Sequence, residues 1–150
     1  MLKVAVIILI VMLAYAGVYA LMTVIAPKVI IESSFKAVTG ESLDSVKDAG
    51  YLKELSLSHR YMGIYALGIV ILGFFVLFAG FRKAQKWAWW ALLIALGIAW
   101  LWGSINTIAV VDTGNLIAHI IGMVLFLVGI FLPVKEFFAK EVKEAEKKET

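Results

Sequence analysis

The stretch VAVIILIVMLAYAGVYALMTVIAP, residues 4–27, decides the fold class, because it runs for 24 residues without a charged side chain. Three more charge-free runs follow, at residues 61–81, 87–111 and 113–134. Each exceeds the roughly 20 apolar residues that cross a hydrocarbon layer about 30 Å thick. In lipid a helix satisfies its own backbone hydrogen bonds, and these runs lack the alternation of barrel strands. The sequence therefore predicts an all-α fold, an integral membrane four-helix bundle in a single domain.

The composition supports this class and excludes several others. Hydrophobic residues make up 63% of the chain and charged residues 17%, against about 45–50% and about 25% in soluble domains. The absence of cysteine excludes disulfides, thiolate nucleophiles and iron–sulfur clusters. The net charge is +3, but the basic residues flank apolar spans, so we interpret them as orientation signals rather than as a nucleic-acid site. The first apolar run is longer than the core of a signal peptide, and we expect it to be retained.

The charge boundaries place the predicted elements. The predicted helices cover about residues 3–26, 59–81, 87–110 and 115–132. The polar connection at 27–58 has apolar residues at partly helical spacing, which predicts one or two short amphipathic helices on the membrane surface. Residues 135–150 contain five Lys and five Glu and predict a charged, solvated helical tail.

The distribution of basic residues predicts the orientation. With four spans, the N-terminus, the loop at 82–86 and the tail share one side, and this side is rich in Lys and Arg. On the other side, residues 28–60 carry five bases balanced by five acids. The positive-inside rule then places both termini in the cytoplasm and residues 28–58 outside. Trp87, Trp89 and Trp90 fit an aromatic belt at the cytoplasmic interface.

Three of the predicted helices each carry a face of small or polar residues at the spacing of a bundle seam. These residues are Ala66, Gly73 and Gly80 on the second helix; Ala91, Ala95, Ala99 and Gly103 on the third; and Asn115, His119, Gly122, Phe126, Gly129 and Pro133 on the fourth. We expect these faces to point into the bundle. The ridge on the third helix is expected to let another backbone approach closely.

Polar residues of the predicted spans gather toward the outer surface, together with acids of the adjoining connections. The candidate ligand-binding residues are Glu32, His59, Asn106, Asp112, Asn115 and His119. Ionisable groups inside a membrane are costly, and a functional site is the usual hypothesis for them. The sequence therefore predicts an outward-facing polar pocket. The alternative is that these side chains only form hydrogen bonds between helices.

Several kinds of chemistry remain open for this pocket. Two histidines with a carboxylate are the ligand types of zinc or non-haem iron, but no HExxH spacing supports a metal. Histidines on two helices could also hold a haem iron. A relay from Ser104 would lack a nucleophile elbow. Recognition of a quinone or a lipid headgroup, or proton relay, needs only one or two polar anchors. No catalytic or metal-binding residue is assigned, and the cofactor is unknown.

The order of features resembles a broad group of small membrane proteins. A long first connection follows Pro27 and contains Phe35, YMGIY at 61–65 opens the second helix, and KWAWWAL at 86–92 opens the third. In these features the chain is similar to the DoxX-like four-helix membrane proteins, over most of residues 4–134. Some relatives are described as subunits associated with quinone-linked oxidoreductases, so the resemblance implies a partner-dependent role. It transfers no catalytic residue.

These observations lead to three hypotheses about function. The first is an accessory or structural subunit of a larger membrane complex, because the chain has little extramembrane mass and no complete catalytic motif. The second is a binder or carrier of a small lipid-like or quinone-like ligand in the outer pocket. A small membrane enzyme or a haem or metal protein is the third. The expected partners are membrane lipids and other membrane subunits or a second copy, with no nucleic acid.

Overall fold

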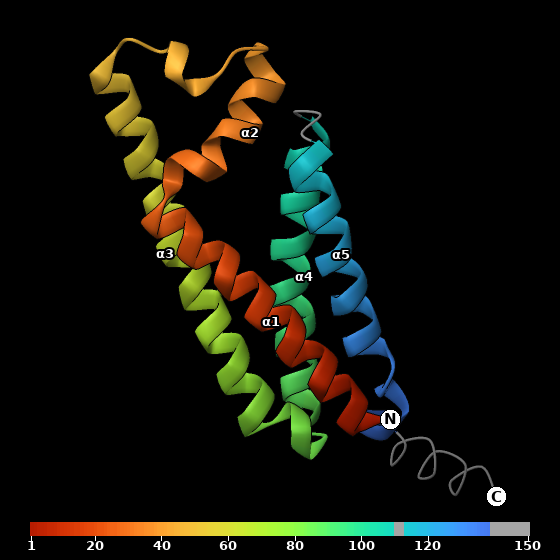
Figure 1. Cartoon of the computed structure of the whole chain (residues 1–150). Coiled ribbons are helices and arrows are strands. Elements are labelled where there is room, and N and C mark those ends of the chain that lie inside the picture. Colours follow the sequence, from red (N-terminus) through yellow and green to blue (C-terminus); the bar gives the residue numbers. More distant parts are fainter. Residues whose placement is uncertain (110–112, 139–150) are drawn as a thin grey trace, which may run out of the picture.

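The computed structural model describes residues 1–109 and 113–138, the side chains of Thr113 and Gly114 excepted, and within these it is helical without strands. Four helices in the described part are long and apolar enough to cross a membrane, judged by length and composition. The elements are α1 (Leu2–Ile25), α2 (Pro27–Thr39), η1 (Leu43–Ser45), α3 (Ala49–Ala79), η2 (Phe81–Lys83), α4 (Lys86–Ala109) and α5 (Thr113–Phe131) (Figure 1). Most of the predicted charged tail, residues 139–150, lies outside the described residues.

Proline and glycine set the limits of the first two helices. Pro27 has no backbone N–H and a fixed φ, so it cannot continue α1 but suits the first position of α2, which it occupies. Ala26 lies between the two helices with φ −128° and makes the bend. Gly40 ends α2 with φ 77°, a left-handed conformation that costs glycine no steric strain. The connection therefore begins with a helix of 13 residues, as its apolar spacing predicted.

The second long helix begins at Ala49, ten residues earlier than predicted. The Asp48 side chain accepts hydrogen bonds from the backbone N–H groups of Gly50 and Tyr51 and caps the helix start. Gly50 is only the second residue of α3, so it does not interrupt the helix. With 31 residues, α3 is about 46 Å long, which exceeds a hydrocarbon layer of about 30 Å.

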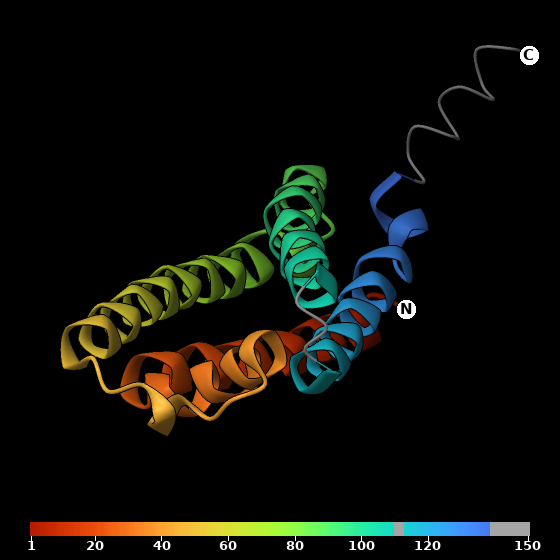
Figure 2. The same cartoon turned by 90° about the horizontal axis from the view of Figure 1, so that it is seen from above.

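The four long helices converge at one end and diverge at the other (Figure 1). Helix α1 packs against both α3 and α5, and α4 packs against α5 and less extensively against α3. The convergent end carries the N-terminus and η2, and α2 lies across the divergent end between α3 and α5 (Figure 1). Seen from above, one end of α3 reaches α4, the two helices point in different directions, and α1 packs along α3 (Figure 2).

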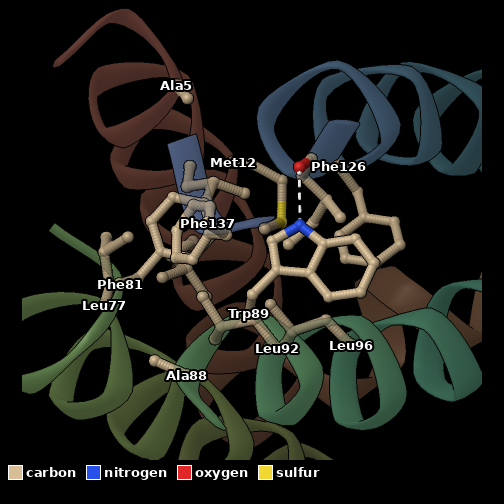
Figure 3. Packing of buried hydrophobic residues seen from close by; sticks show 13 residues of the cluster. Ala5, Met12, Leu77, Phe81, Ala88, Trp89, Leu92, Leu96, Phe126 and Phe137 are labelled. Atoms are coloured by element: carbon tan, nitrogen blue, oxygen red, sulfur yellow. Dashed lines mark hydrogen bonds between the residues drawn. The ribbon is translucent and has the colours of Figure 1, made fainter. Parts of the chain in front are cut away.

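The best-packed part of the molecule lies at the convergent end (Figure 3). The buried Trp89 donates a hydrogen bond from its indole nitrogen to the carbonyl oxygen of Ile130, 2.9 Å away. That carbonyl belongs to the last turn of α5, where helix carbonyls lack partners within the helix. Phe81 and Phe137 pack with ring centroids 4.8 Å apart. The cluster also contains Ala5, Leu9, Met12, Leu13, Leu77, Ala88, Leu92, Leu96 and Phe126.

The small-residue faces of α3 and α5 are buried, as predicted. On α3, a Cβ at Gly63 would lie 3.0 Å from the carbonyl oxygen of Ala20, so α1 and α3 approach each other at backbone distance. On α5, Gly122 receives the ring of Trp100, and Gly129 receives the side chain of Leu9. Glycine at these positions therefore permits contacts that a larger residue would block.

Helix α4 differs from the prediction. Its buried face carries Ala88, Leu92 and Leu96, whereas Ala95 and Ala99 of the predicted ridge are exposed. Four-residue spacing drifts around a helix of 3.6 residues per turn, and the larger leucines, rather than the alanines, fill the space toward α1 and α5. At Ala95 and Ala99 the predicted ridge is thus not the packing face of α4, whereas its last residue, Gly103, lies against His119 of α5.

The three tryptophans of the predicted aromatic belt differ in exposure. Trp87 and Trp90 are about half exposed, at 50% and 49%. Trp89, in contrast, points into the core and bonds Ile130. The sequence alone could not separate these neighbours, because all three tryptophans follow Lys86 within four residues.

Candidate functional site

A cavity of about 300 Å³ lies between α1, α3, α4 and α5, where the packed core ends. Met12, Leu13 and Leu96 belong to both the core and the cavity wall. The rest of the wall consists of Tyr15, Ala16, Tyr19, Ala20, Met62, Ala66, Ile69, Val70, Ala99, Trp100, Ala118 and His119. The cavity exists because the helices diverge above the core.

The cavity opens to the side, between α3 and α4. Three residues of its wall are exposed: Met62 at 61% and Ile69 at 39% on α3, and Ala99 on α4. The exposed part of the cavity wall therefore belongs to α3 and α4.

His119 is the histidine of the cavity wall. Its Nδ1 lies 2.9 Å from the backbone carbonyl oxygen of Asn115, one turn earlier in α5. The imidazole also meets the edges of two aromatic rings, Trp100 at 5.9 Å and Tyr19 at 6.5 Å between centroids. Across from it, a Cβ at Gly103 would lie 2.6 Å from Nε2. These contacts, together with the absence of a side chain at Gly103, set the orientation of the imidazole.

Asn115 joins three helices just outside the cavity. Its Oδ1 accepts a hydrogen bond from the Tyr19 hydroxyl at 3.2 Å, and its Nδ2 donates to the Ser34 hydroxyl at 3.3 Å. Tyr19 belongs to α1 and Ser34 to α2, so one amide connects both to α5. The Thr23 hydroxyl donates to the Tyr19 carbonyl within α1. This network positions α2 over the divergent end and supports the turn of α5 that carries His119.

The structure brings only part of the predicted polar set to the cavity. His119 lines it, and Asn115 supports His119 through its carbonyl. Glu32 instead accepts a hydrogen bond from the backbone N–H of Leu43 at 2.9 Å and holds the connection after α2.

The remaining predicted residues lie elsewhere or outside the description. His59 bonds through Nδ1 to the Leu55 carbonyl of its own helix at 3.0 Å and is not part of the cavity wall. Asn106 is exposed on α4. Asp112 lies outside the described residues.

The chemistry of the cavity is therefore apolar with a few polar groups, rather than polar throughout. Trp100 uses its indole N–H in a contact of 3.3 Å with the sulfur of Met12. Within residues 1–109 and 113–138 there is no group of three or more His, Asp or Glu placed to hold a metal ion. Such a wall favours a hydrophobic molecule with a small polar end.

Sequence reasoning missed three aromatic residues of the wall: Tyr15, Tyr19 and Trp100. A signal was available for the tyrosines, because they lie four residues apart in a charge-free run and so share one face of α1. Trp100 gave no comparable signal, since tryptophans recur along α4 at positions that face both inward and outward.

The chain was compared with protein-family models, with curated proteins and with solved structures, and none of them matches. A functional conclusion must therefore come from the chemistry of the cavity. The resemblance to DoxX-like proteins stays a prediction from the sequence.

Proposed function

We propose that this chain is an integral membrane four-helix bundle that binds a small lipid-like or quinone-like molecule in the cavity beside His119. The proposed orientation has both termini in the cytoplasm and residues 28–58 outside. The observation that carries the proposal is the cavity itself, about 300 Å³ in volume and bounded mainly by apolar side chains. This volume is at the lower end of the roughly 300–1,000 Å³ of small-molecule sites.

The side opening supports a ligand that comes from the membrane. Met62 and Ile69 on one edge and Ala99 on the other would face the hydrocarbon layer if the four helices span it. An apolar molecule dissolved in the bilayer could then enter between α3 and α4 without crossing water. Because the cavity is small, a long tail would remain in the opening while the polar end lies near His119.

Photocrosslinking tests this proposal directly. The probe is a long-chain alcohol that carries a diazirine in the middle of its chain, added to the purified protein in mild detergent. We expect saturable labelling of the residues around the mouth, above all Met62 and Ile69, because the chain would lie between α3 and α4. Peptide mass spectrometry locates the label, and excess unlabelled alcohol should compete for it.

Two variants of α4 provide a matched pair for this experiment. Ala99→Phe places a ring at the mouth and should reduce saturable labelling severalfold. Ala95→Phe makes the same change one turn away, at an exposed residue that does not line the cavity, and should leave labelling unchanged. Unsaturable labelling spread evenly over exposed residues such as Ile71 and Phe75 would overturn the proposed function.

The accessory-subunit hypothesis is a second candidate, supported by the exposed ridge of α4. Ala95 and Ala99 have no helix of this chain against them, although small residues commonly mark helix contacts in membranes. A helix of a partner or of a second copy could pack there. Purification in mild detergent should then yield a stoichiometric partner that Ala95→Leu displaces. A wild-type protein that purifies alone as a monomer would contradict this hypothesis.

A further inference from the structure

The hydrogen bonds around His119 determine which of its ring nitrogens is open to a ligand. A carbonyl oxygen only accepts hydrogen bonds, so the contact between Nδ1 and the Asn115 carbonyl requires that Nδ1 carries the proton. In a neutral imidazole the other nitrogen, Nε2, is then an acceptor with a free lone pair. This carbonyl belongs to the backbone of helix α5, so the helix itself fixes the tautomer with the proton on Nδ1.

Nε2 is also accessible. The described part of the chain contains no buried side-chain nitrogen or oxygen that lacks a hydrogen-bond partner. His119 is only partly buried, and its recorded polar contact is through Nδ1. Nε2 lies beside Gly103 and, since it has no hydrogen-bond partner, it keeps some accessible surface.

The neighbouring donors are already engaged. The Tyr19 hydroxyl donates to Asn115, and the Trp100 indole N–H is directed at the Met12 sulfur. Tyr15 is a further hydroxyl in the wall and can act as donor or acceptor. Among these groups of the wall, the donors of Tyr19 and Trp100 are thus engaged, while the Tyr15 hydroxyl and Nε2 of His119 can accept a hydrogen bond.

We propose that the cavity selects ligands whose polar end is a hydroxyl that donates a hydrogen bond to Nε2 of His119. The ligand class is a phenol, a hydroquinone or a long-chain alcohol, in preference to the corresponding ether, ester or quinone. A ligand without a donor would leave Nε2 unpaired when it displaces water from the site, which carries a penalty. This inference rests on the proposed function.

Competition between two matched compounds tests the inference. Para-nonylphenol and its methyl ether, para-nonylanisole, share the ring and the chain and differ in the hydroxyl. We expect the phenol to displace the diazirine probe about three- to tenfold more effectively, the net effect of one neutral hydrogen bond. The preference should disappear in His119→Phe, which retains a ring against Gly103, and should persist in His59→Gln.

Nitrogen NMR supplies a readout that does not depend on a substitution at His119. The chain has two histidines. When histidine is labelled with nitrogen-15, His59→Gln therefore leaves the imidazole of His119 as the only labelled ring. We expect an unprotonated Nε2 whose signal shifts on addition of the phenol and not of the ether.

The outcomes separate the two proposals. Equal competition by phenol and ether, or a proton on Nε2 in the free protein, overturns the hydroxyl preference and leaves the cavity as a ligand site. Failure of the alcohol probe to label the cavity saturably overturns the proposed function itself.

Discussion

Gly63 is the residue at which α3 approaches the backbone of α1. A Cβ there would lie 3.0 Å from the Ala20 carbonyl oxygen, 3.1 Å from the Val24 nitrogen and 2.8 Å from a Val24 methyl group. Two of these three atoms belong to the backbone of α1 and cannot rotate away. Gly68, five residues later in the same helix, has no atom within 4 Å of the equivalent position. The two glycines therefore differ in environment while sharing a helix.

Alanine at each of these positions separates packing from helix propensity. We expect Gly63→Ala to lower the free energy of unfolding by about 1–3 kcal/mol, because α1 must move away from α3. Gly68→Ala should be neutral or stabilising by up to about 1 kcal/mol, since alanine is the better helix former. Unfolding by SDS in mixed micelles measures both. Equal effects would show that α1 and α3 are not in backbone contact at Gly63.

At the scale of the element, α4 has two apolar faces with different roles. Leu92 and Leu96 are 2% and 4% exposed and contact the core, while Ala95 and Ala99 lie on the open side. Leu93 does not belong to the predicted ridge, yet it also packs partly against the core. The buried face of this helix therefore runs through Ala88, Leu92 and Leu96 and not through Ala95 and Ala99.

Substitutions on the two faces of α4 should have opposite consequences. Leu92→Ala should lower the free energy of unfolding by about 2 kcal/mol or more, because it leaves a cavity in the core. Ala95→Leu should change it by less than about 0.5 kcal/mol, as for other exposed positions. The same SDS titration gives both values. A strongly destabilising Ala95→Leu in the isolated chain would mean that the predicted ridge is the true packing face.

At the scale of the whole molecule, the divergence of the helices produces the site. The core ties α1, α4 and α5 together at one end, and the Asn115 network with Tyr19 and Ser34 ties α1, α2 and α5 at the other. Helix α3 contacts α4 mainly near η2, where Gly80 adjoins Trp87 and Ala88. Beyond this contact the two helices separate, and the cavity lies between them.

The proposed orientation of the whole molecule can be tested by cysteine labelling, since the chain contains no cysteine. A cysteine at Lys47, which is exposed between η1 and α3, should react with an impermeant thiol reagent applied to intact cells. A cysteine at Lys83, exposed in η2, should react only after the membrane is permeabilised. The reverse pattern would contradict the positive-inside assignment and place His119 toward the cytoplasm.

The sequence by itself determined the four long helices and the inward faces of two of them. A charge-free run of more than 20 residues is a local property, and so is the predicted face of Ala66, Gly73 and Gly80 on the second helix, whose spacing of seven matches two helix turns. The helix ends were predicted less accurately. The Asp48 cap starts α3 at Ala49, before Gly50 and ten residues earlier than predicted.

Only the tertiary structure decided which polar residues meet. His59 and His119 both lie toward the same ends of their helices and both bond the carbonyl one turn earlier, yet only His119 lines the cavity. The difference depends on how each helix is rotated about its axis and on where its neighbours diverge. Those quantities follow from contacts between distant residues, such as Trp100 against Gly122 and Gly103 against His119. Periodicity within one helix identifies a face, but the packing of all four helices decides what that face contacts.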